Sequence, residues 1–264
     1  MGESIAVQYD DFQTSFNQEE KQSQYLNYGF SLNPGQTLEE KQELLCKKVF
    51  DEAHIQPGDV IVDVGFGSGQ QDFLLADLYP FKKLTGYNIS SNQVKNANQW
   101  AQEKNLASKM EFKLGPAETL EFNQDESVDK ILAIECAFYF KRSLFYQAAA
   151  RVLKSGGLLV KADISFNSLF TGYITKSEKY RNVGTLSSNS SNWQAYFRTK
   201  TIIDITRYTR SGAQQAVVKI WKNYKNMSAK TQVSWRKMAY SSQLAAWGMF
   251  LKILKYHIIV LEKR

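Results

Sequence analysis

One ten-residue stretch, Val60-Ile-Val-Asp-Val-Gly-Phe-Gly-Ser-Gly69, constrains the fold more than any other part of the chain. A short apolar run with one acid, Asp63, is typical of a buried strand, and it leads directly into Gly65, Gly67 and Gly69. Glycines at these positions permit tight backbone geometry and close approach of a ligand, because a Cβ atom would clash or forbid a positive φ. We therefore expect a strand, a ligand-binding turn and then a helix.

The spacing of these glycines argues against one class of ligand. A dinucleotide-binding turn has the pattern G-x-G-x-x-G, and the pyrophosphate lies at the N-terminus of the following helix. Here the pattern is G-x-G-x-G, and Gln70 comes next. A phosphate cradle therefore fits this turn poorly.

Short apolar runs alternate with amphipathic stretches from about residue 37 to 164, which favours βαβ units and a parallel sheet. Thr37-Leu-Glu-Glu40 has the form of a capping box, so a helix is expected to begin there and to run to about His54. Pro57-Gly58 then breaks the chain. The expected strands are 60–64, 84–89, 110–114, 128–134 and 157–163, and the expected helices between them are 70–78, 91–104 and 142–153.

The pattern changes after Ser165. Residues 166–200 are rich in Ser, Asn, Tyr and Thr, which predicts a loop with one or two short helices. A strand at 201–206, a helical region at about 212–253 and a closing strand at 256–261 are expected next. The segment between the last two strands is longer than a simple connection needs, so we expect it to cap the site.

Composition limits the class of protein. The chain has 264 residues and is 43% hydrophobic, which suffices for the core of one elaborated domain. The sequence shows neither a signal-peptide pattern nor an apolar run approaching about 18 residues, so a cytoplasmic location is expected. Its two cysteines, Cys46 and Cys136, lie far apart, and no Cys or His stands at metal-ligand spacing. We expect neither a disulfide nor a bound metal.

The net charge of +7 is unevenly distributed. Residues 166–264 contain 17 Lys or Arg and three acids, whereas residues 1–165 carry a net charge of −7. A basic C-terminal region can attract an anionic acceptor, a nucleic acid or an anionic membrane, to which we expect weak, salt-sensitive association. The alternative is a solvated basic surface, because the charges are scattered. The cations of the expected cap are Lys219, Lys222, Lys225, Lys230, Arg236 and Lys237.

Beyond residue 69 several segments occur in an order typical of one family. The first motif reads as the Asp/Glu-x-Gly-x-Gly-x-Gly of class I S-adenosylmethionine-dependent methyltransferases, which the sequence resembles. The segment 84–93 is similar to the second strand of the branch that contains natural-product sugar O-methyltransferases, sterol C-methyltransferases and cyclopropane fatty acid synthases. Leu114-Gly-Pro-Ala-Glu118 corresponds to the segment of that family that contacts adenine, with Pro116 where Asp is usual.

Three further segments extend the resemblance. Residues 127–135 resemble the fourth strand, and Ala150-Arg-Val-Leu-Lys-Ser-Gly-Gly157 resembles the Arg-Val-Leu-Lys-Pro-Gly-Gly turn. Tyr25-Leu-Asn-Tyr-Gly-Phe30 resembles the Asn-x-Gly-aromatic segment that folds over the cofactor. The resemblance implies a seven-stranded, mostly parallel α/β sheet with helices on both faces, a Rossmann-like methyltransferase fold with an antiparallel last strand and a helical cap. We expect one domain, 1–264, with an N-terminal helical segment 1–56, a cofactor-binding core 57–165, and cap insertions 166–200 and 211–254.

The resemblance also implies S-adenosyl-L-methionine as the cofactor. In that alignment the amide of Asn88 would meet the ribose hydroxyls, while the backbone N–H of Ala117 and the carboxylate of Glu118 would meet the adenine. The complete set of expected cofactor contacts is Tyr28, Asp63, Gly65, Gly67, Gly69, Asn88, Ser90, Gln93, Pro116, Ala117, Glu118 and Glu135.

The residue that would act as general base departs from the family pattern. Related small-molecule methyltransferases have Glu-Cys-Ala-aromatic-His-Phe after the fourth strand, but here Tyr139 stands in place of the His. A tyrosine with a pKa near 10 is a poor base at neutral pH, and neither His54 nor His257 is suitably positioned. The alternatives are another base, such as Glu135 or Asp163, or an acceptor that needs no early deprotonation, such as an amine, an enolate or an alkene.

Aromatic residues indicate the class of acceptor. We expect a small, lipophilic or aromatic metabolite of secondary metabolism, methylated on O, N or C, with Tyr139 and Glu135 as the catalytic residues. The rings after the fourth strand could stabilise a cation by cation–π attraction, or they could simply pack against the sheet. The expected substrate contacts are Phe138, Tyr139, Phe140, Tyr173, Trp193 and Phe197.

Two other functions are alternatives to this one. A nucleic-acid methyltransferase would suit the basic region, but enzymes that methylate amino groups of bases carry Asp/Asn-Pro-Pro-aromatic after the fourth strand. This chain has Glu135-Cys-Ala-Phe there and no Pro-Cys nucleophile. A non-catalytic partner subunit with the same fold is the other alternative, and the intact glycines oppose it.

Overall fold

A computed structural model of the chain describes residues 25–33, 35–170, 182–224 and 229–264. Tyr173 and Lys225 lie outside the described residues, and the side chains of Lys230 and Lys237 are not described. Within the described part of the chain, no helix is both long enough and apolar enough to cross a bilayer.

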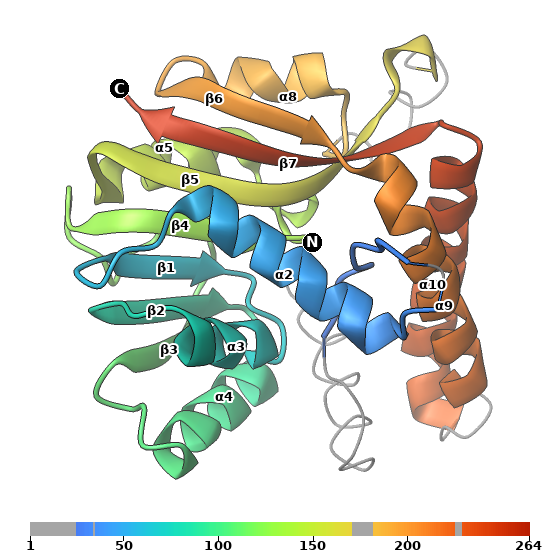
Figure 1. Cartoon of the computed structure of the whole chain (residues 1–264), viewed down its shortest axis with the longest axis horizontal. Coiled ribbons are helices and arrows are strands. Elements are labelled where there is room, and N and C mark those ends of the chain that lie inside the picture. Colours follow the sequence, from blue (N-terminus) through green and yellow to red (C-terminus); the bar gives the residue numbers. More distant parts are fainter. Residues whose placement is uncertain (1–24, 34, 171–181, 225–228) are drawn as a thin grey trace.

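The centre of the fold is a seven-stranded sheet with the order β3-β2-β1-β4-β5-β7-β6 (Figure 1). The strands β1 to β5 run parallel, and β7 is antiparallel to both of its neighbours, β5 and β6. This arrangement confirms the predicted sheet. The strands are β1 Val60–Val64, β2 Lys83–Asn88, β3 Met110–Leu114, β4 Val128–Ile134, β5 Leu153–Phe166, β6 Phe197–Asp204 and β7 Leu254–Lys263.

Helices cover both faces of the sheet and bury two apolar layers. Figure 1 shows α2 Leu38–Ala53, α3 Gln70–Leu78 and α4 Ser91–Glu103 in front of the sheet, with α5 Arg142–Val152 behind it. Along β5, Leu158 and Val160 pack in the front layer, whereas Leu159 packs in the rear layer. This alternation follows from the two-residue period of a strand, and it explains why central strands read as continuous apolar runs.

The start of α2 confirms the predicted capping box. The N–H of Glu40 donates to the Thr37 hydroxyl oxygen at 3.2 Å, and the Glu40 carboxylate accepts from the N–H of Thr37 at 2.7 Å. The helix ends before His54, whose φ of +50° lies in the left-handed region. The cap therefore satisfies N–H groups that the first helical turn leaves without partners.

The C-terminal third differs from the prediction in two ways. The sixth strand begins at Phe197 rather than 201, and all but two of its residues are exposed, because it is the outer edge of the sheet. Its polar residues therefore carry no alternating pattern that would reveal the strand. The predicted helical region is two helices, α9 Thr206–Tyr224 and α10 Ala229–Phe250, and Asp204 accepts from the N–H of Thr206 where α9 begins.

These two helices lie beside the end of the sheet at which the parallel strands finish (Figure 1). Their inner side contacts the N-terminal segment, since the N–H of Ser31 donates to the carbonyl of Tyr208 at 2.8 Å. The contact is closest at Gly212 in α9, where an added Cβ atom would lie 1.9 Å from the carbonyl oxygen of Tyr28. Only glycine allows the two segments to approach this closely.

We predict that Gly212→Ala lowers the free energy of unfolding by about 1–3 kcal/mol, because the methyl group must displace the segment at Tyr28. In an open helix the same change stabilises by roughly 1 kcal/mol, so the sign is diagnostic. Urea denaturation measures it. Gly58→Ala is the control, since nothing lies within 4 Å of that position. A stabilised Gly212→Ala variant would contradict the close contact.

Candidate functional site

A cavity of about 490 Å³ lies at the carboxyl ends of β1, β2 and β4. Ligands bind at this edge of open α/β sheets, because the loops that follow the strands converge there. Of the expected site residues, those that line the cavity are Gly65, Gly67, Asn88, Gln93, Pro116, Ala117, Glu118, Glu135, Tyr139 and Phe140.

The turn after β1 shows why glycines stand there. Gly65, Gly67 and Gly69 have φ values of +67°, +62° and +85°, all in the region that favours glycine. A Cβ atom at Gly65 would lie 2.6 Å from Cβ of Cys136. Gly65 and Gly67 face the cavity, whereas Gly69 does not line it and instead caps the N-terminus of α3.

Asp63 lies beneath the turn rather than on the cavity wall. Its carboxylate accepts from Nε2 of Gln71 at 2.5 Å, and Gln71 itself lines the cavity. Burial raises the pKa of Asp63 to about 7, and burial together with Asp63 raises the pKa of the neighbouring Asp72. This pair therefore retains a proton near neutral pH, and Asp63 acts on the cavity through Gln71 rather than directly.

Two amide side chains form the wall after β2. Nδ2 of Asn88 donates to Oε1 of Gln93 at 2.8 Å and to the carbonyl of Gly67 at 3.2 Å. Its Oδ1 accepts from the N–H of Ser90 at 3.1 Å. Ser90 does not line the cavity: it is the N-cap of α4, where its hydroxyl accepts from the N–H of Gln93. It positions Gln93 instead.

The wall after β3 is mostly backbone and apolar surface. Pro116 and Ala117 line the cavity, and Ala117 is buried. The carboxylate of Glu118 accepts from the N–H of Lys141 at 3.0 Å, which joins this wall to the loop after β4. Lys141 also lines the cavity and was not expected there.

Glu135 ends β4 and connects three parts of the chain. Its Oε1 accepts from the N–H of Tyr28 and from the hydroxyl of Tyr256 on β7, both at 2.6 Å. Its backbone has a φ of +53°, which turns the carboxylate out of the strand direction. Burial raises the pKa of Glu135 to about 8, although both hydrogen bonds oppose the shift. Tyr28 thus reaches the site through its N–H, and it does not line the cavity.

The aromatic residues after β4 divide into two groups. Tyr139 and Phe140 line the cavity, and the Tyr139 side chain is exposed. Phe138 does not line it: this ring is half-buried against the front layer, 4.4 Å from the ring of Tyr139. Only the first two are therefore placed to meet an acceptor directly.

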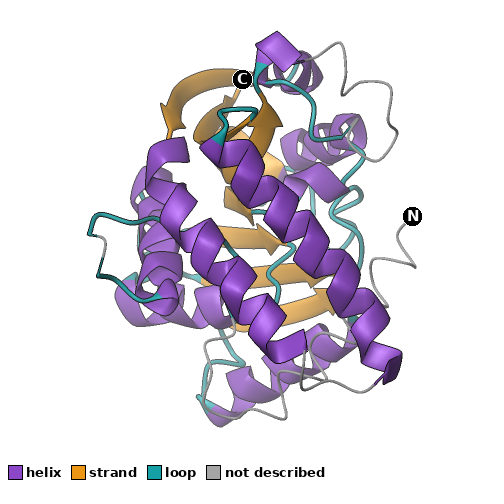
Figure 2. Cartoon of the chain, turned by 90° about the vertical axis from the view of Figure 1, so that its right-hand side faces the viewer, coloured by secondary structure: helices purple, strands orange, loops and turns teal. Residues whose placement is uncertain are grey.

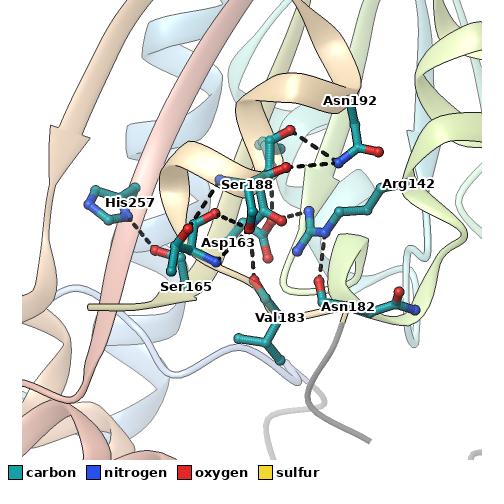
Figure 3. A network of polar contacts seen from close by, with 11 residues as sticks. Arg142, Asp163, Ser165, Asn182, Val183, Ser188, Asn192 and His257 are labelled. Carbon is teal, nitrogen blue, oxygen red and sulfur yellow. Dashed lines mark hydrogen bonds and ion pairs between the residues drawn. The ribbon is translucent and has the colours of Figure 1, made fainter. Parts of the chain in front are cut away.

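Asp163 is not placed to act as a base. Figure 3 shows Arg142 of α5 reaching toward Asp163 on β5, and Nη1 of Arg142 lies 2.7 Å from Oδ2 of Asp163. Lys161 contacts the same oxygen at 2.8 Å. Burial opposes ionisation, but the two cations outweigh it and lower the pKa of Asp163 to about 2. Asp163 does not line the cavity, so of the two carboxylates considered, Glu135 remains.

Two predicted substrate contacts are wrong. Trp193 and Phe197 are each 1% exposed and pack in the rear layer, away from the cavity. The Trp193 ring lies over the fully buried Lys161, with Nζ 4.9 Å from the ring centroid, and both rings pack against Tyr146. Trp193 therefore covers a buried cation instead of an acceptor, and Phe197 packs beside it in the same layer. Residues 166–200 thus contribute one described cavity residue, Asn182, whose carbonyl accepts from Nε of Arg142 at 2.7 Å.

Sequence reasoning missed part of the lining. Tyr25, Leu26 and Asn27 form a wall that the resemblance of the 25–30 segment indicated only in general terms. Neither Gln71 nor Asn182 follows a pattern that identifies a site, because long-range packing brings each to the cavity. The two histidines do not line the cavity within the part of the chain that the structure describes.

Residues 62–161 match the family model of a methyltransferase domain. These residues extend from β1 to the middle of β5 and include most of the cavity wall. The sheet order and the antiparallel β7 agree with the match. Residues 62–161 are therefore similar to a methyltransferase domain, and the sheet has the order of the Rossmann-like methyltransferase fold.

Some known proteins resemble the chain in sequence, and others resemble it in fold alone. Erythromycin 3''-O-methyltransferase of Saccharopolyspora erythraea is 33% identical over 141 residues, which cover 53% of this chain and 46% of that protein. The 27-O-demethylrifamycin SV methyltransferase of Amycolatopsis mediterranei is 27% identical over 194 residues, 70% and 71% of the two chains. The cyclopropane synthase MmaA2 of Mycobacterium tuberculosis shares the fold, with a TM-score of 0.81 at 16% identity over 100% of this chain and 98% of that one. The chain thus matches about half the length of the first relative.

The acid pair beneath the turn predicts how stability depends on pH. The pKa of Asp63 rises from 3.8 to about 7 on folding, so the folded chain binds protons more tightly than the unfolded chain. The free energy of unfolding should therefore fall as the pH rises from about 4 to 7. Asp72→Asn should flatten this fall by an amount on the order of a few kcal/mol, since one pKa unit corresponds to about 1.4 kcal/mol.

Denaturation in guanidinium chloride at several pH values between 4 and 8 measures this slope. Asp77→Asn on the same helix is the matched control, because Asp77 is exposed and should leave the slope unchanged. Equal slopes in the wild type and Asp72→Asn would show that the pair does not share a proton.

Proposed function

We propose that the protein is an S-adenosylmethionine-dependent methyltransferase that methylates O, N or C of a small, lipophilic or aromatic metabolite. One observation carries the proposal: a single cavity joins the glycine turn, the amide wall after β2 and the aromatic residues after β4. A transfer enzyme needs this continuity, because donor and acceptor must be held in line and in contact. The two free, buried cysteines fit a reducing compartment, which supports the cytoplasm as its location.

The cavity residues fit the proposed cofactor at three points. Gly67 leaves open the space that a Cβ atom would fill, 3.1 Å from Cδ1 of Leu26. Asn88 and Gln93 offer amide groups for ribose hydroxyls, and Ala117 lines the same cavity, which supports its proposed backbone contact with adenine. When bound, S-adenosylmethionine supplies an electrophilic methyl group on a sulfonium sulfur. The chain has only to bind, orient and, where needed, accept a proton.

The acceptor end is apolar. Leu26 lines the cavity and belongs to the same apolar cluster as Ile220, Tyr224 and Met238 from α9 and α10. Leu26, Tyr139 and Phe140 line the cavity and offer a surface suited to a lipophilic or aromatic acceptor. The inner side of the helical pair thus supports its proposed role as part of the cap over the site.

Glu135 is the residue best placed to accept a proton. Both of its hydrogen bonds go to Oε1, and the carboxylate lines the cavity. A pKa of about 8 lies close to neutral pH, where a general base works efficiently. We assign Glu135 as the base for acceptors that carry a proton, and Tyr139 as a residue that contacts the acceptor.

The glycine turn provides the direct test of cofactor binding. Gly67→Val should weaken binding of S-adenosylhomocysteine by at least about 100-fold, roughly 3 kcal/mol, because the side chain occupies cofactor space and resists the positive φ. Calorimetric titration of the folded variant measures this. Gly156→Val separates the two causes, since Gly156 has a φ of +75° and nothing within 4 Å. Undiminished affinity in Gly67→Val would refute the cofactor assignment.

The proposed base predicts a pH profile. Because Glu135 acts only when ionised, kcat/KM for the cofactor should rise with pH and level off above pH 8, near the pKa of about 8. Glu135→Gln keeps an oxygen for both hydrogen bonds but should lower the rate by about 100-fold and abolish the rise. Glu118→Gln, which changes another cavity carboxylate, should keep the rise. Full activity in Glu135→Gln would show that the acceptor needs no base from this residue.

A further inference from the structure

The outer face of α10 carries an apolar stripe. Tyr240, Leu244, Trp247 and Leu251 recur every three or four residues, so they lie along one side of the helix and the turn that follows it. Their exposures are 58%, 51%, 59% and 60%. Phe250 beside them is 62% exposed. We call the four recurring residues the α10 stripe. Figure 2 views the helical pair from outside, where α9 and α10 lie side by side at the surface.

Packing within the fold accounts for only part of the α10 stripe: the Tyr240 ring contacts the Trp221 ring of α9 at a centroid distance of 5.5 Å, whereas Leu244 and Trp247 stay more than half exposed. The inner face of the same helix buries mostly small residues, among them Ala239, Ala245 and Ala246, together with Met249. The larger apolar side chains of this helix segment therefore point to solvent. A helix selected only for docking onto its own core would have the opposite arrangement, and a contiguous exposed apolar patch marks an interaction site.

Charge identifies the class of partner. Between Asp204 and Glu262 the chain contains ten Lys or Arg and no Asp or Glu. Arg236 precedes Tyr240 by four residues and Lys252 follows Leu251, and both cations are exposed. The stripe is thus an apolar band with positive charge at each end, on a helical pair that lacks acidic side chains.

This combination disfavours two alternative partners. A second copy would form a symmetric interface and bring two cationic helical pairs together, which like-charge repulsion opposes. A nucleic acid would satisfy the cations but offers phosphates, not an apolar interior, to four large exposed apolar side chains. An anionic lipid surface satisfies both features, because its headgroups attract the cations and its acyl boundary accepts the rings.

We propose that the α10 stripe docks the protein on anionic membranes, with Trp247 and Leu244 entering the acyl boundary and Arg236 and Lys252 contacting headgroups. The inner side of the same helical pair lies close to the cavity wall, since Met238 of α10 and the cavity residue Leu26 belong to one apolar cluster. Docking therefore places the apolar end of the cavity near the membrane. The inference rests on the proposed function only in treating the acceptor as a lipophilic molecule drawn from the bilayer.

Cosedimentation of the whole chain with vesicles tests the docking without any turnover. Binding to phosphatidylcholine vesicles that contain phosphatidylglycerol should exceed binding to pure phosphatidylcholine and should weaken as salt is raised. The double variant Leu244→Gln, Trp247→Gln should lose at least about tenfold in affinity. The matched control, Leu78→Gln with Leu144→Gln, removes two exposed leucines from α3 and α5 and should bind like the wild type.

Other results would overturn the inference. Equal binding by the stripe variant and its control would show that the stripe does not dock. A concentration-dependent dimer that the stripe variant abolishes, seen by sedimentation velocity, would assign the surface to a second copy. Tighter retention of single-stranded RNA than of anionic vesicles would assign it to nucleic acid. Titration with S-adenosylhomocysteine keeps the tests separate: the stripe variant should bind it normally, so a loss of vesicle binding cannot be confused with failure of the proposed activity.

Discussion

The site depends on one carboxylate, Glu135. It ends the central strand β4, and its Oε1 accepts from the N–H of Tyr28 and the hydroxyl of Tyr256. These two hydrogen bonds hold the N-terminal segment and the antiparallel strand β7 against the end of β4. Because Leu26 and Asn27 immediately precede Tyr28, the same bonds hold one wall of the cavity in place. Because Tyr28 also contacts Gly212 closely, its position in turn constrains the position of α9 and the helical pair.

The sheet buries acidic groups on both faces and stabilises them in opposite ways. On the front face Asp63 and Asp72 have no cation among their described neighbours, so burial raises both pKa values and the pair holds a proton. On the rear face Arg142 and Lys161 neutralise Asp163, whose pKa falls to about 2. Glu135 has hydrogen-bond donors but no cation among its described contacts, so it can titrate near neutral pH. Asp63 also titrates near neutral pH, but of these two groups only Glu135 lines the cavity, where it can exchange a proton with an acceptor.

The sequence predicted most reliably those parts of the fold that neighbouring residues specify. The strand, glycines and helix between residues 60 and 78, and the capping box at Thr37, are specified by neighbouring residues, and the structure confirms them. Trp193 and Phe197 could not be placed in this way. Each is an aromatic residue in a polar segment, which suggests a pocket, but a buried lysine 32 residues away from Trp193 requires a cover. The lysine needs this cover because of the order of the strands, and no pattern in the residues near Trp193 indicates it.

The structure also reduces the number of candidate bases at the site. The sequence offered Glu135 and Asp163 as alternative bases and favoured Glu135 as the catalytic residue. Two cations make Asp163 a permanent anion, and its place outside the cavity removes it from contact with an acceptor. Among the described cavity residues the carboxylates are Glu118 and Glu135, and Glu118 lies on the wall after β3. An acceptor between Leu26 and Tyr139 therefore either gives its proton to Glu135 or reacts without losing one.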